Sequence, residues 1–287
     1  MNKKGIILAG GFGTRLFPLT RVISKQLLPV YDKPMIYYPL TTLMQIGIKD
    51  VMIIATFEDV LRYEKILGDG KDLGINISYK VQLSPRGIPD SFLVCEEFIG
   101  KDPVTLILGD NIFYGKDLDI LLRSTNAHTD GASVFAIEVD EPEKYGVVEK
   151  SSSGKIVKIL EKPKNPPSNL AVTGLYFYDN DVVEIAKNIK ESARGELEIT
   201  DVNNVYLEQG KLHLIHFNES VTWFDTGGFD TLLDAAIFVK NEQKRFHTPV
   251  GSPEWTAYKN GWISKEALYE LGQKSKKSDY GKMLLSL

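Results

Sequence analysis

The chain has 287 residues, of which 43% are hydrophobic and 25% charged, as expected for a globular protein of one large domain or two modest ones. A net charge of −4 argues against a nucleic-acid-binding surface. The single cysteine, Cys95, excludes an internal disulfide and suits a reducing compartment. No signal peptide precedes the first apolar run, and no run has the length of a membrane span, so we expect a cytoplasmic protein.

The first half of the chain alternates short strands with helices. Apolar runs predict strands at residues 5–9, 51–56, 77–82 and 104–108, and helical spacing predicts helices at 35–46 and 58–67. An amphipathic helix is expected at 90–99, with Cys95 as buried filler rather than a nucleophile. This alternation predicts an α/β fold with a mostly parallel mixed sheet, which binds ligands beyond the carboxyl ends of its strands.

The second half begins with strands and ends with helices. Strands are predicted at 132–139, 146–150, 155–160 and 174–178, which indicates a β-rich section over the ligand-binding edge of the first sheet. Helices follow at 182–191, 198–207 and 231–246, and the tail from residue 265 is helical with a polar face.

A glycine-rich turn follows the first strand, in the segment Leu8-Ala9-Gly10-Gly11-Phe12-Gly13-Thr14-Arg15-Leu16. Glycine lets backbone amides approach phosphate closely, and Arg15 matches phosphate oxygens with two donors. The Walker pattern is absent because Thr14-Arg15 stands where Lys-Ser/Thr is needed, and Leu16 breaks the dinucleotide fingerprint. A glycine-rich turn alone is often only a tight turn, but with Arg15, and with Lys25 ten residues on as a second cation, it indicates a site for the phosphates of a nucleotide.

Two acids follow apolar strands far apart in the sequence. Asp110 ends Leu106-Ile107-Leu108-Gly109-Asp110, and Asp225 ends Trp223-Phe224-Asp225. Asp110 alone is equally well explained as the cap of a turn, but the pair fits two ligands of one Mg²⁺ ion. Glu161-Lys162 at another strand end is either a surface ion pair or a contact for sugar hydroxyls and phosphate.

Taken together, these segments resemble the sugar nucleotidyltransferases, and in particular the bacterial glucose-1-phosphate thymidylyltransferases. The resemblance runs through the whole chain. It is carried by LAGGFGTRL at 8–16, SKQLLPVYDKPMIYYPL at 24–40, LGDNIFYG at 108–115, YGVVE at 145–149, LEKP at 160–163, VTGLYFYD at 172–179, GELEITDVN at 195–203 and WFDTG at 223–227.

The resemblance implies a Rossmann-like nucleotidyltransferase core in which a phosphate oxygen of glucose 1-phosphate attacks the α-phosphorus of dTTP and pyrophosphate leaves. It implies catalytic roles for Arg15, Lys25, Asp110, Lys162 and Asp225, with Mg²⁺ bound by Asp110 and Asp225. The implied nucleotide-binding residues are Leu8, Gly10, Gly11, Gly13, Thr14, Arg15, Gln26, Gln82, Gly87 and Asp110. The implied sugar-phosphate-binding residues are Asn111, Tyr145, Gly146, Glu161, Lys162 and Val172.

The same resemblance predicts how the chain is divided and assembled. Residues 1–245 form the core, with a nucleotide-binding part at about 1–130 and a sugar-phosphate-binding part at about 131–230. Residues 246–287 form a helical oligomerisation or regulatory segment of a homotetramer. Three neighbouring aromatics in that segment, Trp255, Tyr258 and Trp262, suggest a face that is buried on assembly. The implied pathways are dTDP-rhamnose and lipopolysaccharide synthesis.

Two departures from the family concern the substrate. Gly87-Ile88-Pro89-Asp90-Ser91 stands where relatives read Gly-Leu-Ala-Gln-Ala, and Gly228-Phe229 stands where relatives read Thr-His. Asp90 either starts the following helix as a favourable N-terminal charge, which we prefer, or reaches the base and favours one with donors, such as guanine. The alternatives are therefore the same reaction with UTP, GTP or another sugar 1-phosphate, or a non-catalytic regulator that binds nucleotide sugars.

Overall fold

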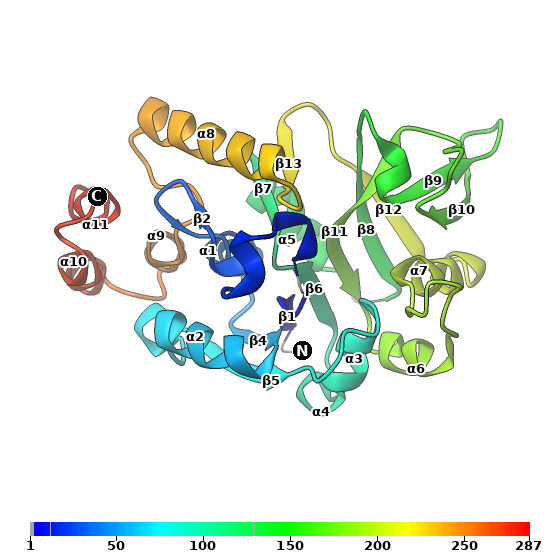
Figure 1. Cartoon of the computed structure of the whole chain (residues 1–287), viewed down its shortest axis with the longest axis horizontal. Coiled ribbons are helices and arrows are strands. Elements are labelled where there is room, and N and C mark those ends of the chain that lie inside the picture. Colours follow the sequence, from blue (N-terminus) through cyan, green and yellow to red (C-terminus); the bar gives the residue numbers. More distant parts are fainter. Residues whose placement is uncertain (1–2, 12, 129) are drawn as a thin grey trace.

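The computed structural model describes residues 3–11, 13–128 and 130–287. Its centre is a mixed sheet in the order β10-β9-β11-β6-β1-β4-β5, and β8 pairs with both β11 and β12 (Figure 1). The strands of this sheet are β1 (Lys4–Leu8), β4 (Asp50–Ala55), β5 (Asn76–Val81), β6 (Val104–Leu108), β8 (Ala132–Glu138), β9 (Gly146–Lys150), β10 (Ile156–Glu161), β11 (Leu170–Tyr178) and β12 (Leu212–His216).

The four strands nearest the N-terminus form the larger parallel part of the sheet, and β12 also pairs in parallel with β8. β1 pairs in parallel with β4 and β6, and β4 pairs in parallel with β5. The sheet is then extended by antiparallel pairs of β11 with β6, β8 and β9. Two small sheets lie outside it, β2 (Pro29–Val30) with β3 (Lys33–Pro34) and β7 (Asn111–Gly115) with β13 (Val221–Asp225). The expected α/β architecture is confirmed.

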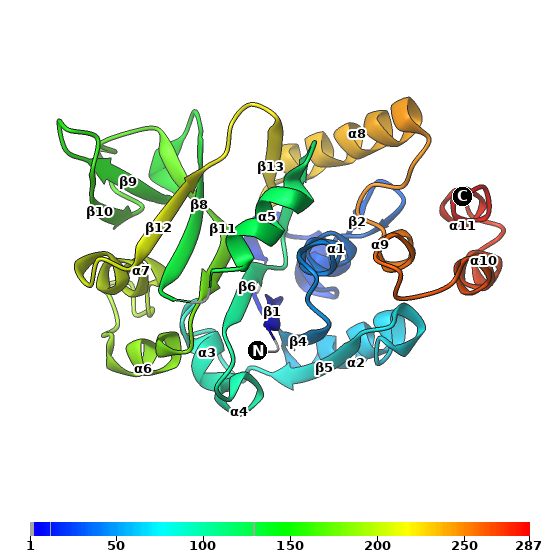
Figure 2. The same ribbon diagram turned by 180° about the vertical axis from the view of Figure 1, so that it is seen from behind.

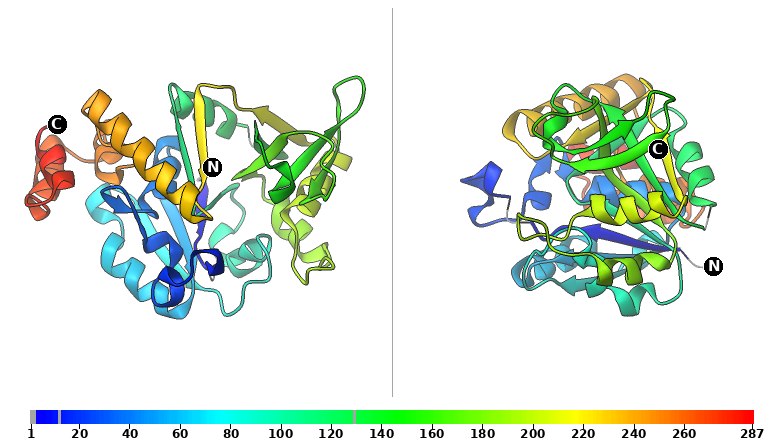
Figure 3. Two further views of the ribbon diagram at one scale, coloured as in Figure 1. Left: turned by 45° about the horizontal axis from the view of Figure 1, so that its top comes forward. Right: turned by 90° about the vertical axis from the view of Figure 1, so that its right-hand side faces the viewer.

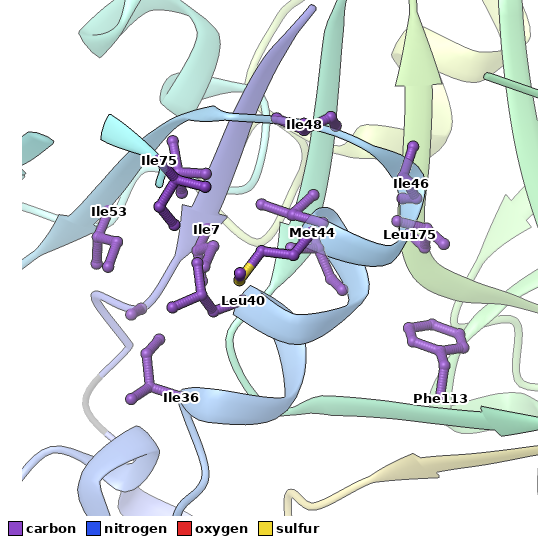
Figure 4. Close-up of a cluster of buried hydrophobic side chains, with 14 of the residues drawn as sticks. Ile7, Ile36, Leu40, Met44, Ile46, Ile48, Ile53, Ile75, Phe113 and Leu175 are labelled. Atoms are coloured by element: carbon purple, nitrogen blue, oxygen red, sulfur yellow. The ribbon is translucent and has the colours of Figure 1, made fainter. Parts of the chain in front are cut away.

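Helices cover both faces of the sheet because its strands are apolar on both sides. Successive residues of a strand point to opposite faces of the sheet and therefore belong to different hydrophobic cores. Ile7 packs with Ile53 and Leu40 on one face, and Ile6 packs with Ile54 and Phe92 on the other. Figure 4 shows the first core, in which Ile7, Ile36, Leu40 and Met44 gather between β1 and α1.

Most of the helices are close to those expected from the hydrophobic spacing, but those at Leu118–Asn126 and Pro253–Lys259 were not predicted. They are α1 (Tyr37–Ile46), α2 (Phe57–Leu67), α3 (Asp90–Val94), α4 (Glu96–Ile99), α5 (Leu118–Asn126), α6 (Asp181–Asn188), α7 (Ile199–Glu208), α8 (Phe229–Phe246), α9 (Pro253–Lys259), α10 (Lys265–Lys274) and α11 (Asp279–Leu285). Seen from behind, α1 and α5 lie on one face of the sheet (Figure 2). The single helix predicted at 90–99 is divided at Cys95, which is buried as expected.

The C-terminal helices α10 and α11 lie at one end of the molecule and the β9–β10 hairpin at the other (Figure 3). Trp255, Tyr258 and Trp262, the aromatics expected on an assembly face, are each half-buried within the chain. Trp255 and Tyr258 pack against Leu268 and Tyr280, so their clustering is explained by this chain's own fold. Within the described ranges, no helix combines the length and apolar character needed to cross a membrane.

Candidate active site

The glycine-rich turn leaves the carboxyl end of β1 and leads into a short 3-10 helix at Thr14–Leu16. Gly13 has φ of 58°, which favours glycine, and its carbonyl accepts a hydrogen bond from Thr20 Oγ1 at 2.7 Å. Phe12 lies outside the described residues. The main-chain groups of Gly11 and Thr14 are in an exposed segment beyond the strand end, where ligands bind in open α/β sheets.

The two acids predicted from distant strand ends lie together. Asp110 follows β6, and Asp225 ends β13 directly opposite Asn111 in the β7–β13 pair. The backbone N–H and the hydroxyl of Thr226 both donate to the carbonyl of Asp110, at 3.1 and 2.7 Å, which fixes the two segments against each other. Burial, and next the charge of Asp110, raise the pKa of Asp225 to about 6.

A buried cation faces these acids. Lys25, which is 8% exposed, forms an ion pair with Asp110. Burial opposes the ionisation of Asp110, but the Lys25 ammonium and the Asn111 amide hold the pKa of this carboxyl below its usual value. Ser24 donates to Gln26 Oε1 at 2.8 Å, so Gln26 stabilises the segment that presents Lys25.

Arg15 reaches the same place from the glycine-rich turn. A Cβ added to Gly227 would lie 2.5 Å from Arg15 Nη2, so the guanidinium packs directly on this glycine. Gly227 follows Asp225 by two residues, and Arg15 lines one cavity with Asp110 and Asp225. Two cations and two acids from four segments therefore converge, as the sequence predicted.

The two acids fit a divalent cation. Both are carboxylates on the wall of one cavity, and carboxylate oxygens are the ligands that a hard divalent cation prefers. Among residues 3–11, 13–128 and 130–287, no cluster of three or more His, Cys, Asp and Glu side chains has a geometry to hold a metal. The protein would therefore supply two ligands, and phosphate oxygens and water the others.

Asn111 holds Asp110 in place. Its side-chain oxygen accepts hydrogen bonds from the backbone N–H of Gly174 at 3.0 Å and from Trp223 Nε1 at 2.6 Å. Its Nδ2 donates to Asp110 Oδ1 at 3.1 Å. Asn111 lines the cavity as the resemblance implied, but these protein contacts already occupy its oxygen.

A cavity of about 510 Å³ opens beside Asp110 and Asp225. Glu161 and Lys162 lie on its wall, with Nζ and Oε1 3.6 Å apart, and Lys162 has φ of 42°. Burial, only partly offset by the Lys162 ammonium, raises the pKa of Glu161. The remaining residues that the resemblance assigned to the sugar phosphate also line this cavity: Asn111, Tyr145, Gly146 and Val172.

Two further polar groups that the sequence did not single out lie in or next to this cavity. Arg194 lines an adjoining cavity with Glu161 and Glu198, where its Nη2 lies 3.4 Å from Glu161 Oε1 and 2.7 Å from Glu198 Oε2. Asn203 is fully buried on the wall of the 510 Å³ cavity, and its Nδ2 has no hydrogen-bond partner among the described residues. Asn203 lies inside the motif at 195–203, which was noted without a role for any of its side chains.

A second cavity, of about 440 Å³, lies on the other side of the glycine-rich turn. Gly10, Gly11 and Gln82 line it, as expected for nucleotide-binding residues. The other residues expected to bind the nucleotide are absent from its lining: Leu8, Gly13, Thr14, Arg15, Gln26, Asp110 and Gly87. A backbone contact explains the need for glycine at Gly87. Its φ is 104°, and an added Cβ would lie 2.1 Å from the Leu197 carbonyl oxygen.

Asp90 does begin a helix, as preferred from the sequence, but its side chain does not cap it. α3 has no side-chain hydrogen bond at its N-terminus. The carboxylate instead accepts a hydrogen bond from Gln82 Nε2 at 2.8 Å. Asp90 is not among the residues lining either cavity, so a direct approach to the base finds no support.

Comparison with known proteins agrees with this geometry. The model of the nucleotidyl transferase family matches residues 4–242. A glucose-1-phosphate thymidylyltransferase of Neisseria meningitidis serogroup A is 53% identical over 284 residues, covering 99% of each chain. The crystal structure of a Bacillus anthracis protein provisionally given the same name superposes with a TM-score of 0.76 at 43% identity, covering 82% of this chain and 94% of that one.

A UDP-glucose pyrophosphorylase complexed with UDP-glucose is also similar, with a TM-score of 0.73 at 28% identity and coverage of 84% and 100%. The chain therefore belongs to the nucleotidyl transferase family, and it is a nucleotidyltransferase. Within that family, its similarity along the full chain places it with the glucose-1-phosphate thymidylyltransferases.

Proposed function

We propose that the protein transfers the thymidylyl group of dTTP to glucose 1-phosphate, giving dTDP-glucose and pyrophosphate. The observation that carries this proposal is the convergence of Arg15, Lys25, Asp110 and Asp225 beside the 510 Å³ cavity. The cavity beside Gly10 and Gly11 is assigned to the nucleotide. The cavity beside Glu161 is assigned to the sugar 1-phosphate, so that the reacting phosphates meet between the two.

The side chains suit direct transfer between bound phosphates. Lys25 and Arg15 neutralise charge that develops on the α-phosphate and the leaving pyrophosphate. Asp110 and Asp225 would hold Mg²⁺, which supplies further charge neutralisation when bound. Because the sugar phosphate is itself the nucleophile, the site needs only alignment and charge stabilisation. The buried Cys95 lies elsewhere, at the junction of α3 and α4, and burial raises the pKa of its thiol to about 12.

A pyrophosphate-release assay tests the substrate assignment. Four nucleoside triphosphates (dTTP, UTP, GTP and ATP) are each combined with several sugar 1-phosphates and Mg²⁺. We expect the highest kcat/KM with dTTP and glucose 1-phosphate. UTP is the main competitor, since the similar pyrophosphorylase is complexed with UDP-glucose. A preference for GTP would contradict the proposed base. Absence of pyrophosphate with every pair would favour a non-catalytic regulator.

Replacing Glu161 should act on the sugar side of the reaction. Glu161 lies on the wall of the 510 Å³ cavity, and it is absent from the lining of the nucleotide cavity. For Glu161→Ala we expect the KM for glucose 1-phosphate to rise about tenfold or more, because a charged hydrogen bond contributes about 1.5–3 kcal/mol. The KM for dTTP should stay within about twofold. A change confined to the dTTP dependence would contradict the assignment of this cavity.

We also propose a homotetramer working in the cytoplasm, with residues 246–287 as its oligomerisation or regulatory segment. Exposed apolar side chains on α8 support assembly, since Phe229, Leu233 and Ile237 are 50%, 59% and 47% exposed. The buried, unpaired Cys95 suits a reducing compartment. Light scattering at micromolar concentration should give four times the mass of the chain. A monomer mass would contradict this proposal.

A further inference from the structure

Gln82 presents one end of its side-chain amide to the nucleotide cavity. The residue follows β5 and is 7% exposed, and its backbone N–H donates to the Ala55 carbonyl at 2.9 Å. A Cβ added to Gly10 would lie 3.1 Å from Gln82 Oε1, and both residues line the cavity. No hydrogen bond to Oε1 is formed by any described residue. This oxygen is therefore an available acceptor beside the glycine-rich turn.

The opposite end of the amide is held by Asp90. Gln82 Nε2 donates to Asp90 Oδ2 at 2.8 Å, and both residues are more than nine-tenths buried. A carboxylate has acceptors only, so it accepts the amide nitrogen and rejects the amide oxygen. Asp90 also has a charged neighbour in Arg86, whose Nη1 lies 3.7 Å from Oδ1. Asp90 thus sets the direction in which the Gln82 amide points.

This direction matters for a pyrimidine base. Thymine and uracil carry an N–H donor at N3 and an acceptor at O4, whereas cytosine carries an acceptor at N3 and a donor at N4. A side-chain amide with a fixed orientation presents one defined atom, oxygen or nitrogen, to the base. When the base is held in one position, that atom pairs either with thymine and uracil or with cytosine, but not with both. An oxygen that faces the cavity accepts from the thymine N3–H, and it repels the cytosine N3 lone pair.

We propose that Asp90 is a positioning residue that selects thymine and uracil over cytosine by fixing the carbonyl oxygen of Gln82 toward the base. This inference rests on the proposed function, because it places the base of the triphosphate in the cavity lined by Gln82. Asp90 never touches the nucleotide. Its effect on base selection depends entirely on the orientation of the Gln82 side-chain amide. Discrimination between dTTP and UTP depends on other parts of the site.

Asp90→Asn tests the proposal with almost no change in shape. Asn offers either an oxygen or an NH₂ group to Gln82, so the Gln82 amide becomes free to reverse. The measurement is kcat/KM for dTTP and for dCTP, each with glucose 1-phosphate, from pyrophosphate release. The ratio of the two should fall about tenfold or more, since one correctly paired base edge contributes about 1–3 kcal/mol. Because both values come from one preparation, loss of folded protein leaves the ratio unchanged.

Two further variants make the test specific. Arg86→Gln removes the neighbouring ion pair and keeps the Asp90 carboxylate, so its ratio should stay within about twofold of the parent chain. In a Gln82→Leu background, Asp90→Asn should change the ratio no further, because the side chain through which it acts is gone.

The proposal is overturned if Asp90→Asn turns over dTTP with an unchanged ratio, or if its effect persists fully without Gln82. It is also overturned if the parent chain does not discriminate between dTTP and dCTP. Failure of the proposed function has a different signature, which is the absence of pyrophosphate release with any nucleotide.

Discussion

Asp110→Asn and Asp225→Asn should each lower kcat by about 100-fold or more, the cost of removing one electrostatic contact from a transition state. Both acids lie on one cavity with little exposure, and each variant removes an anionic ligand from the site assigned to Mg²⁺. For Asp110→Asn the effect has a second cause, because Lys25 also loses its ion-pair partner. Steady-state pyrophosphate release at several Mg²⁺ concentrations measures both effects.

Asp230→Asn is the matched control for these two variants. Asp230 is an exposed acid in the first turn of α8, five residues beyond Asp225, and its kcat should stay within about twofold of the parent chain. Circular dichroism should show unchanged folding for all three variants. Activity within a few-fold of the parent for both Asp110→Asn and Asp225→Asn, at saturating substrates and Mg²⁺, would contradict the metal assignment.

Arg15→Ala should lower kcat/KM for dTTP by about 100-fold or more and should lower kcat as well. The guanidinium packs on Gly227, next to Asp225, so it is placed to contact phosphate in both the bound substrate and the transition state. A residue that assists only ground-state binding would raise KM and leave kcat unchanged. Steady-state kinetics with dTTP as the varied substrate separates these outcomes.

Gly227→Ala gives an independent test of the placement of Arg15. Its added Cβ would lie 2.5 Å from Arg15 Nη2, so the flexible guanidinium must move away. The variant should reproduce part of the Arg15→Ala effect while keeping every charge. Arg245→Ala removes an exposed arginine from the end of α8 and should leave the kinetics unchanged. Full activity of both Arg15→Ala and Gly227→Ala would show that the guanidinium takes no part.

Hydrophobic periodicity was sufficient to predict most of the fold. The spacing of apolar residues in strands and helices follows directly from which side chains are buried. Strands such as β6 and β9 therefore begin and end at the predicted residues. β7 and β12 were not predicted. β7 follows β6 after a single turn, and β12 is only partly buried, so neither forms a distinct apolar run.

The convergence of Asp110 and Asp225 was expected because both acids end apolar strands. The two strands belong to different sheets, and the acids meet because β13 pairs with β7, which begins directly after Asp110. The contact between Gln82 and Asp90 could not be predicted in the same way. It depends on how the loop between β5 and α3 folds, where Gly87 pairs with Leu197, a residue more than one hundred positions further along the chain. The isolated sequence therefore favoured a simple helix-start role for Asp90.

Isotope tracing tests the central claim most directly, namely that the two cavities bring a sugar phosphate against the α-phosphorus of a nucleoside triphosphate. Glucose 1-phosphate labelled with ¹⁸O throughout its phosphate group is incubated with dTTP, Mg²⁺ and the enzyme, and the products are analysed by mass spectrometry. The account predicts dTDP-glucose that retains all of the label, including the oxygen between the two phosphorus atoms, and unlabelled pyrophosphate. Label in pyrophosphate, or dTMP and pyrophosphate without any dTDP-glucose, would contradict it.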